Sequence, residues 1–156
     1  MTTQPFAKEQ EALSKSRLRL WLRILKLSSG IETELRRRLR EEHSTTLPRF
    51  DVLSALARYP EGLKMSELSG HLRVSNGNVT GIVDRLSEEG LVLRVAVHGD
   101  RRAQLARLTQ KGHETFATLA AHHEIWIDEL LRNVTREDAL HLMTLLDTAT
   151  RKQESE

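Results

Sequence analysis

One uninterrupted amphipathic stretch limits the folds open to this 156-residue chain. Between Lys15 and Glu42 there is no proline and a single glycine, Gly30. Apolar residues recur every three or four positions from Leu20 to Leu39, which is the period of one face of an α-helix. Further leucines widen this apolar face in the first half of the segment. A helix this apolar needs more than one partner surface, so we expect other helices to pack against it.

The rest of the chain also reads as mainly helical. The whole chain is rich in Leu, Arg, Glu and Ala, and it has only three prolines and six aromatic residues. Pro48 restarts the chain after the long helix, and the segment 59–62 is a strong stop signal. We expect a loose arm over 1–8 and further helices over 49–58, 66–72, 75–89, 110–132 and 136–151. Thr109 is the predicted N-cap of the helix over 110–132, and Thr135 opens a capping box for the helix over 136–151.

Two short segments predict a β-hairpin. Residues 91–97 have the β-branched content of a strand, and residues 104–108 alternate as a return strand. The connecting segment 98–102 contains Gly99 and two arginines, so we expect a turn with a basic tip. The predicted fold class is therefore mainly α with a small β-hairpin.

Composition excludes several classes of protein. The chain has no cysteine, which rules out disulfides, thiolate zinc sites, iron–sulfur clusters and cysteine nucleophiles. No apolar stretch approaches the roughly 18–20 residues of a membrane span, and the first residues lack the apolar region of a signal peptide. No phosphate loop or nucleophile motif is present, so we expect a cytoplasmic protein that is not an enzyme, with no cofactor and no membrane partner.

The central segment 48–108 has the order helix, short helix, turn, helix, hairpin, which is typical of a winged helix-turn-helix. The second helix of such a pair enters the major groove of DNA, so its exposed residues near the N-terminus should be small or polar and not acidic. The segment before Asp84 meets this requirement, while the residues that should face the core are Val79, Ile82, Val83 and Leu86. The predicted base-reading residues are Ser75, Asn76, Gly77, Asn78, Thr80 and Gly81.

The distribution of charge favours a polyanionic partner on one side. The net charge is +7 over residues 15–40, +4 over 91–112 and −5 over 113–156. A cation at the hairpin tip suits the narrow minor groove of DNA. An ordinary solvated face is the alternative interpretation of such charge runs. The predicted contacts outside the recognition segment are Arg85, Arg94, Asp100, Arg101 and Arg102.

Nearly the whole chain resembles the MarR family of bacterial transcriptional regulators. The motifs that carry the resemblance are V-D-R-L at 83–86, G-L-V at 90–92, D-R-R at 100–102 and L-T-Q-K-G at 108–112. The stretch S-N-G-N-V-T-G at 75–81 is similar to the branch that controls the catabolism of aromatic acids such as hydroxycinnamates. In the family's wing motif the aspartate orients an arginine two residues on, here Asp100 and Arg102.

This resemblance implies a single MarR-type domain over 1–156. Within it, residues 48–108 form the DNA-binding lobe, and residues 9–42 and 110–151 form helices that build a homodimer. The family binds double-stranded DNA at a palindromic operator. We therefore expect a ligand-responsive transcription regulator, most simply a repressor that is released by a small molecule.

A candidate effector site follows from the aromatic and basic residues of the flanking helices. Family members bind effectors between the dimer helices and the DNA-binding lobe, so aromatic side chains there can hold an aromatic body and arginines an anionic end. Plain core packing of the aromatics and solvated arginines are the alternatives. An aromatic acid and an aromatic acyl-CoA both fit the predicted site residues, which are Trp21, Leu25, Arg36, Arg38, Arg40, Phe50 and Phe116.

Two other functions compete with this prediction. The chain has seven histidines, and His43, His113, His123 and Glu124 could serve a metal-responsive regulator, although surface or partly buried histidines are the ordinary alternative. A winged-helix interaction module that does not bind DNA is the third possibility. Such a module has no need of the arginine pair at the hairpin tip, which weighs against it.

Overall fold

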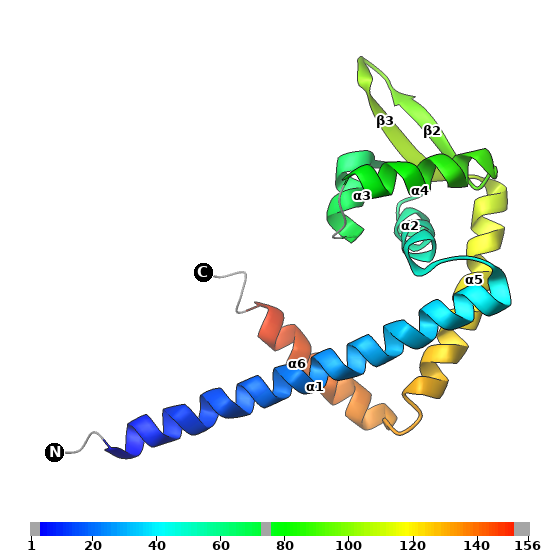
Figure 1. The fold of residues 1–156 in the computed structure, drawn as a ribbon. Helices are drawn as coiled ribbons and strands as arrows, with labels where there is room; N and C mark the ends of the chain where they lie inside the picture. The colour runs from blue at the N-terminus through cyan, green and yellow to red at the C-terminus, as the bar shows by residue number, and fades with distance from the viewer. Residues whose placement is uncertain (1–3, 73–75, 152–156) are drawn as a thin grey trace. The chain divides into compact units, whose positions relative to one another are not determined.

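The computed structural model describes the backbone of residues 4–72 and 76–151 (Figure 1). The chain divides into two compact units, Met1–His123 and Glu124–Glu156, which are treated separately below. The elements in chain order are α1 (Gln4–His43), α2 (Leu47–Arg58), β1 (Leu63–Lys64), α3 (Met65–Leu72), α4 (Asn76–Glu88), β2 (Val92–Val97), β3 (Asp100–Leu108), α5 (Gln110–Leu130) and α6 (Arg136–Arg151).

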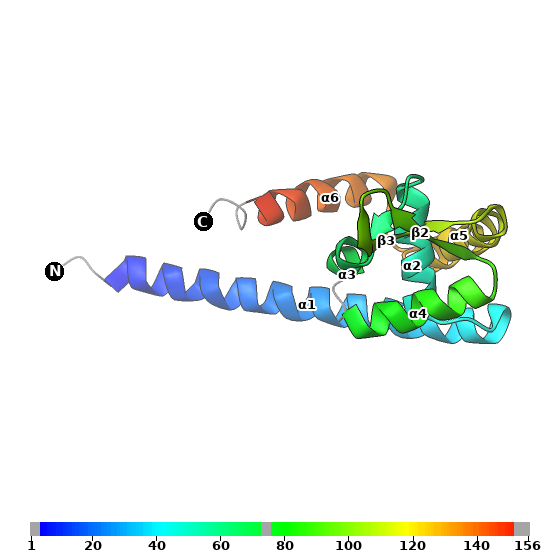
Figure 2. The same ribbon diagram turned by 90° about the horizontal axis from the view of Figure 1, so that it is seen from above.

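The long helix α1 is continuous from Gln4 to His43, about 60 Å at 1.5 Å per residue (Figure 2). The expected loose arm over 1–8 is wrong for residues 4–8, which are helical. Pro5 does not prevent this, because the first turn of a helix has no internal partner for a backbone N–H in any case. Only the C-terminal part of α1 reaches the core, where Leu35 and Leu39 are buried.

Helix α2 lies at the centre of the first unit. The Thr46 hydroxyl caps its N-terminus by accepting from Arg49 N at 3.4 Å, and a proline occupies its first turn. Helices α3 and α4, the sheet and the end of α1 all contact it. The buried apolar residues of this unit are Leu35, Leu39, Leu47, Phe50, Val52, Leu53, Ala55, Leu56, Leu63, Leu68, Val79, Val83, Leu86, Leu91, Val92, Ala106, Leu108 and Leu119.

The sheet has three antiparallel strands in the order β1-β3-β2. The sequence predicted β2 and β3, but it gave no signal for β1, because two residues are too few for a periodicity. Leu63 pairs with Ala106 and Lys64 with Leu105. Gly62 precedes β1 with φ 96°, and a Cβ on it would lie 2.9 Å from the carbonyl oxygen of Ala106. Glycine is therefore required where the chain enters this strand.

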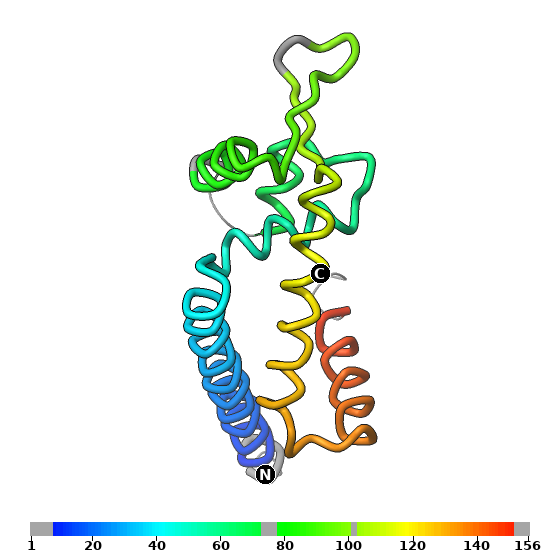
Figure 3. Tube along the Cα trace, turned by 90° about the vertical axis from the view of Figure 1, so that its right-hand side faces the viewer, coloured from blue at the N-terminus to red at the C-terminus, as the bar shows by residue number. Residues whose placement is uncertain are grey.

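The β2–β3 hairpin extends beyond the helices of the lobe (Figure 3). The predicted turn over 98–102 is longer than the turn in the structure. The turn consists of His98 and Gly99, and Asp100–Arg102 already belong to β3. Gly99 has φ 89°, which permits this tight connection. Ala96 pairs with Gln104 and Val97 with Asp100, so β3 carries three extra residues, 101–103, between the two pairs.

Helix α5 begins where the sequence predicts. Thr109 Oγ1 accepts from Gly112 N at 2.9 Å and donates to the carbonyl of Gly90 at 2.6 Å. The helix ends at Leu130, two residues before the expected end. Three backbone hydrogen bonds continue past this end, including Val134 N to Leu131 O at 2.8 Å, and they form the turn that leads to α6.

Helix α6 in the second unit is capped by Thr135, whose Oγ1 accepts from Asp138 N at 3.1 Å. The hydroxyl also donates to the Asp138 carboxylate at 2.7 Å, so the expected reciprocal bond to the backbone is replaced by a side-chain bond. No residue of α6 is buried within this chain. Among the described residues, no helix is long and apolar enough to cross a membrane.

Candidate nucleic-acid interface

The two faces of α4 differ as the sequence predicts. Val79, Val83 and Leu86 are completely buried, which confirms their assignment to the core. Ile82, which was also assigned to the core, is only half-buried, because it lies at the edge of this face. The opposite face exposes small and polar side chains close to the N-terminus of the helix. Between residues 78 and 85 the exposed residues are Asn78, Thr80, Gly81, Asp84 and Arg85. One face of α4 packs on the core, and the first residues of its other face carry no negative charge. Such a helix can enter a major groove without repelling the DNA phosphates.

Part of the predicted interface lies at the limits of what the structure describes. Ser75 is outside the described residues. Asn76 and Gly77 begin α4, and Arg101 and Arg102 lie in β3 beside the turn, but their side chains are outside the described part of the chain. The backbone therefore puts the two arginines in the projecting end of the hairpin.

Arg94 links the hairpin to α4. Its Nη2 lies 2.7 Å from Asp84 Oδ1, and its Nη1 donates to Gln104 Oε1 at 3.4 Å. The sequence predicted a DNA contact for Arg94 and missed this pairing, because Arg94 and Asp84 lie on different elements. The ion pair neutralises the acidic group on the exposed face of α4 and holds the hairpin against the helix.

The C-terminal end of α4 is fixed by the start of α5. Lys111 Nζ donates to the carbonyl of Glu89 at 3.0 Å, and Glu89 also pairs with Arg49 of α2. Gly90 follows with φ 76°, as expected of the glycine that ends a helix. Gly112 passes so close to Leu91 that a Cβ would lie 2.0 Å from the Leu91 carbonyl oxygen. These contacts hold the C-terminal end of α4 against α2 and the start of α5.

Only part of the predicted effector site comes together. The ring centroids of Phe50 and Phe116 are 5.8 Å apart, and the His123 ring stacks on Phe50 at 4.7 Å. Burial lowers the pKa of His123. Trp21 and Leu25, by contrast, are 54% and 44% exposed on the N-terminal part of α1.

The predicted arginines lie further along α1 and already have acidic neighbours. Arg36 pairs with Glu32 at 3.0 Å, and Arg38 pairs with Glu34 at 2.9 Å. The side-chain hydrogen bonds from Arg37 and Arg38 lower the pKa of Glu34 to about 2. Arg40 is exposed. Fifteen residues separate Trp21 from Arg36, about 22 Å along a helix, so these groups do not share one small site.

A cleft opens beside the phenylalanine pair, between the end of α1, α2 and α5. Arg49 is its cation, and Thr115 and Thr118 offer hydroxyl groups next to Phe116. None of the seven predicted effector residues lines it; Arg49 was missed, although it directly precedes Phe50 in sequence. The lining residues are His43, Ser44, Thr45, Arg49, Leu53, Glu89, Leu91, Thr115, Thr118 and Leu119.

Among the described residues, the histidines considered as metal ligands do not form a cluster. His43 Nε2 lies 2.6 Å from Nδ1 of His122, which was not one of them, whereas His123 lies on Phe50 and His113 is exposed. Over residues 4–72 and 76–151, no group of three or more His, Cys, Asp or Glu side chains is placed to hold a metal ion.

Comparisons with known proteins agree with this geometry. The MarR family model matches residues 45–103. A MarR family transcriptional regulator from Silicibacter pomeroyi is 36% identical, with 90% of this chain and 96% of that chain covered and a TM-score of 0.75. A mutant MarR from E. coli, solved with operator DNA, is 26% identical over 86% of this chain and 95% of that one, with a TM-score of 0.71.

Among curated relatives, the transcriptional activatory protein BadR of Rhodopseudomonas palustris is 29% identical over 85% of this chain and 79% of BadR. PecS of Dickeya dadantii, a transcriptional regulator of the same helix-turn-helix type, is 29% identical over 62% of this chain and 60% of PecS. These relatives are regulators of transcription rather than enzymes. With its winged helix-turn-helix lobe, this chain belongs to the MarR family of transcriptional regulators.

Proposed function

We propose that this chain is a sequence-specific DNA-binding regulator whose α4 reads the major groove of a palindromic operator. The observation that carries the proposal is the two-faced α4, with a completely buried apolar side and an exposed polar side whose aspartate is neutralised by Arg94. The E. coli relative solved with operator DNA supports the same use of the fold. In this proposal, residues 1–156 form one MarR-type domain, and residues 48–108 are its DNA-binding lobe.

The proposed contacts are of two kinds. Residues at the start of α4 read base edges, and the hairpin arginines enter the minor groove, with Asp100 orienting Arg102. Arg94 acts mainly within the lobe. The proposed set on α4 is Ser75, Asn76, Gly77, Asn78, Thr80, Gly81 and Arg85.

The test of base reading is a comparison of operator and random DNA at one stated salt concentration. Asn78→Ala or Thr80→Ala should reduce discrimination between the two DNAs. Arg102→Ala should weaken operator binding by about 1–3 kcal/mol, the scale of one good base contact. Thr148→Ala, on exposed α6, is the matched control and should change neither. Unchanged operator affinity in the α4 and Arg102 variants contradicts the proposal.

We further propose that two copies bind together through α1, α5 and α6, because a palindrome requires a two-fold symmetric reader. Footprinting should then show two half-sites about one helical turn apart, roughly 10 bp from centre to centre. A single asymmetric footprint from a monomer would contradict this arrangement.

The proposed effector is an aromatic, anionic molecule, either a free acid or its CoA thioester, that releases the regulator from DNA. Phe50 and Phe116 offer an aromatic surface, and Arg49 in the adjoining cleft offers a cation that an anionic effector would share with Glu89, its partner in the structure. Arg38 and Arg40 extend the basic surface toward larger anionic groups. An effector must favour one state of the protein, since equal affinity for both states shifts nothing.

Calorimetry decides whether such an effector acts. An aromatic acid and its CoA thioester would each be titrated into the protein alone and into the protein–operator complex. We expect tighter binding to the free protein and a matching loss of operator affinity. If neither compound binds, or if operator affinity is unchanged by binding, the effector proposal fails while the DNA-binding proposal stands.

A further inference from the structure

Arg49 connects three helices of the first unit. It lies in the first turn of α2, and its side chain is only 20% exposed. Nη2 of this arginine pairs with the carboxylate of Glu89, which directly follows α4. Nε donates to Oγ1 of Thr45 at 3.3 Å, in the short connection between α1 and α2. One guanidinium group therefore joins the end of α1 to the end of α4.

Both partners of Arg49 are fixed to the helices beside them. The backbone N–H of Thr45 donates to the carbonyl of Leu39 at 3.1 Å, and Leu39 is completely buried in the last part of α1. The N–H of Glu89 donates to the carbonyl of Arg85 at 3.1 Å, so Glu89 continues the hydrogen bonding of α4. These contacts form a chain of bonds that runs from Leu39 of α1 to Arg85 of α4.

The bond from Arg49 differs from the other contacts at this end of α4. Lys111 Nζ donates to the carbonyl of Glu89 at 3.0 Å. Thr109 Oγ1 donates to the carbonyl of Gly90 at 2.6 Å. Both donors lie at the start of α5, whereas Arg49 holds the same end to α2 and to the connection from α1. Because the Glu89 side chain is 48% exposed, loss of Arg49 leaves a hydrated carboxylate rather than a buried unpaired charge.

The position of Glu89 affects the opposite end of α4. Asn78 lies eleven residues before Glu89, about 16 Å along the helix. Val83 is completely buried midway between them. A tilt of α4 about Val83 therefore moves Asn78 about as far as it moves Glu89, in the opposite direction. Hydrogen bonds to base edges tolerate little displacement, since they need donor–acceptor distances of about 2.7–3.2 Å.

We propose that Arg49 is a positioning residue for operator recognition, a role that rests on the DNA-binding function proposed above. Arg49 acts through Glu89 and contacts no base. The ion pair sets the angle of α4 relative to α1, and in a dimer joined through α1 this angle sets the distance between the two recognition helices. The pair thus makes the protein selective for the spacing of the operator half-sites as well as for their sequence.

The experiment measures selectivity for half-site spacing. The wild type first selects a palindrome from a pool of random-sequence DNA. Its dissociation constant is then measured for this palindrome and for the same DNA with one base pair inserted at the centre. The insertion moves one half-site by about 3.4 Å and rotates it by about 35°. The second dissociation constant divided by the first is called the spacing ratio.

Arg49→Gln and Glu89→Gln should each lower the spacing ratio about threefold or more, the effect of losing one partly exposed ion pair in each of two lobes. The two substitutions change the net charge in opposite directions. A general electrostatic effect therefore changes DNA affinity in opposite directions, whereas loss of the pair lowers the spacing ratio in both variants. Arg49→Glu combined with Glu89→Arg restores the pair and should return the ratio to within about twofold of the wild type.

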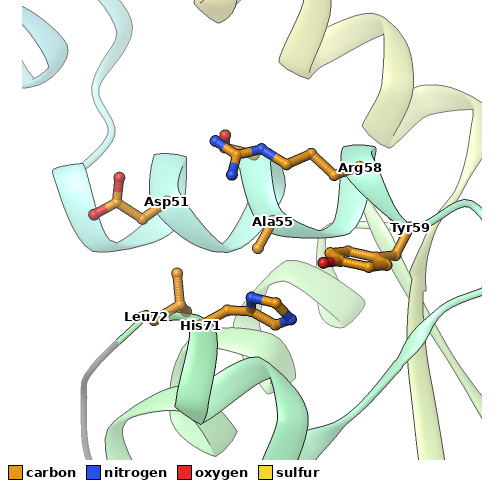
Figure 4. Close-up of a pocket in the computed structure, with 7 residues that line it drawn as sticks. Asp51, Ala55, Arg58, Tyr59, His71 and Leu72 are labelled. Carbon is orange, nitrogen blue, oxygen red and sulfur yellow. The ribbon is translucent and has the colours of Figure 1, made fainter. Parts of the chain in front are cut away.

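Arg58→Gln is the matched control on the same helix. Arg58 is exposed and lines a pocket between α2 and α3 (Figure 4). Among the described residues it forms no ion pair with α4. Its substitution removes the same charge and should leave the spacing ratio unchanged. Urea unfolding shows whether each variant is folded, and the exposed Glu89→Gln variant provides the test if Arg49→Gln does not fold.

Several results would overturn the role of Arg49. An unchanged spacing ratio in a folded Arg49→Gln or Glu89→Gln variant does so, as do opposite changes in the two variants or an equal loss in Arg58→Gln. A wild-type ratio near one, or no recovery in the exchanged pair, also overturns it. If the wild type selects no palindrome, the proposed DNA-binding function fails and this role fails with it. If a palindrome is selected, any of the other results overturns the role of Arg49 alone.

Discussion

At the scale of single residues, Gly112 decides how closely α5 approaches the end of α4. A Cβ at this position would lie 2.0 Å from the carbonyl oxygen of Leu91, and this neighbour is backbone rather than a flexible side chain. Gly112→Ala should therefore destabilise the protein by about 1–3 kcal/mol, the usual cost of overpacking. Urea unfolding of the variant and the wild type measures the difference.

Gly70 provides the matched control for this prediction. It is also a helical glycine, but no atom lies within 4 Å of a Cβ built on it. Gly70→Ala should stabilise the protein by up to about 1 kcal/mol, because alanine loses less conformational freedom in a helix. Equal effects of the two substitutions would show that the contact with Leu91 does not matter.

His123 makes stability depend on pH. Its folded pKa is lowered by burial against Phe50, so the folded state binds fewer protons than the unfolded state near the ordinary pKa of about 6.5. The contribution of neutral His123 to the free energy of unfolding is therefore complete above about pH 6.5, the ordinary pKa of histidine. It is lost as the pH falls toward the lowered pKa of the folded state. His123→Phe should lose less stability than the wild type between pH 7.5 and 5.5, measured by urea unfolding. An identical loss in both proteins would exclude this role.

At the scale of elements, the ion pair of Asp84 and Arg94 joins α4 to the hairpin. Both side chains are partly exposed, at 52% and 27%, so solvent screening limits the coupling to about 0.5–1 kcal/mol. A double-mutant cycle with Asp84→Asn and Arg94→Gln measures it through urea unfolding. A coupling energy of zero would mean that the pair does not tie the two elements together.

At the scale of the whole molecule, two apolar surfaces are left without a partner in one chain. Leu18 and Leu22 are 57% and 53% exposed on α1, and Leu142 and Leu146 are 49% and 51% exposed on α6. Exposed apolar surface of this extent marks an interaction site, and a second copy of the chain is the partner that the proposed function requires.

Charge on α6 tests this interface. Leu146 lies at the centre of the apolar face of α6, whereas Thr148 lies on the opposite face, about 160° away at 100° per residue. Leu142→Glu combined with Leu146→Glu should convert a dimer into a monomer, with a halved mass in light scattering. Thr148→Glu should remain a dimer. Retention of the dimer mass in the double variant would place the interface elsewhere.

The sequence by itself determined the features that depend on local patterns. Apolar spacing identified the long helix and most of the buried face of α4, and cap residues located the Thr109 start of α5 and the Thr135 start of α6. The family motifs at 83–86 and 100–102 identified the winged lobe. These signals are local because a helix, a cap or a tight turn involves residues a few positions apart.

Tertiary structure alone decided which distant side chains meet. The two-residue strand β1 forms only because β3 is present to pair with it, and Arg94 meets Asp84 only when the hairpin folds onto α4. The predicted effector set joined Trp21 to Phe50, yet α1 carries Trp21 away from the lobe and the cleft beside Phe116 contains Arg49 instead. Sequence spacing fixes position along one element, whereas a site depends on the packing of several elements, which no local pattern records.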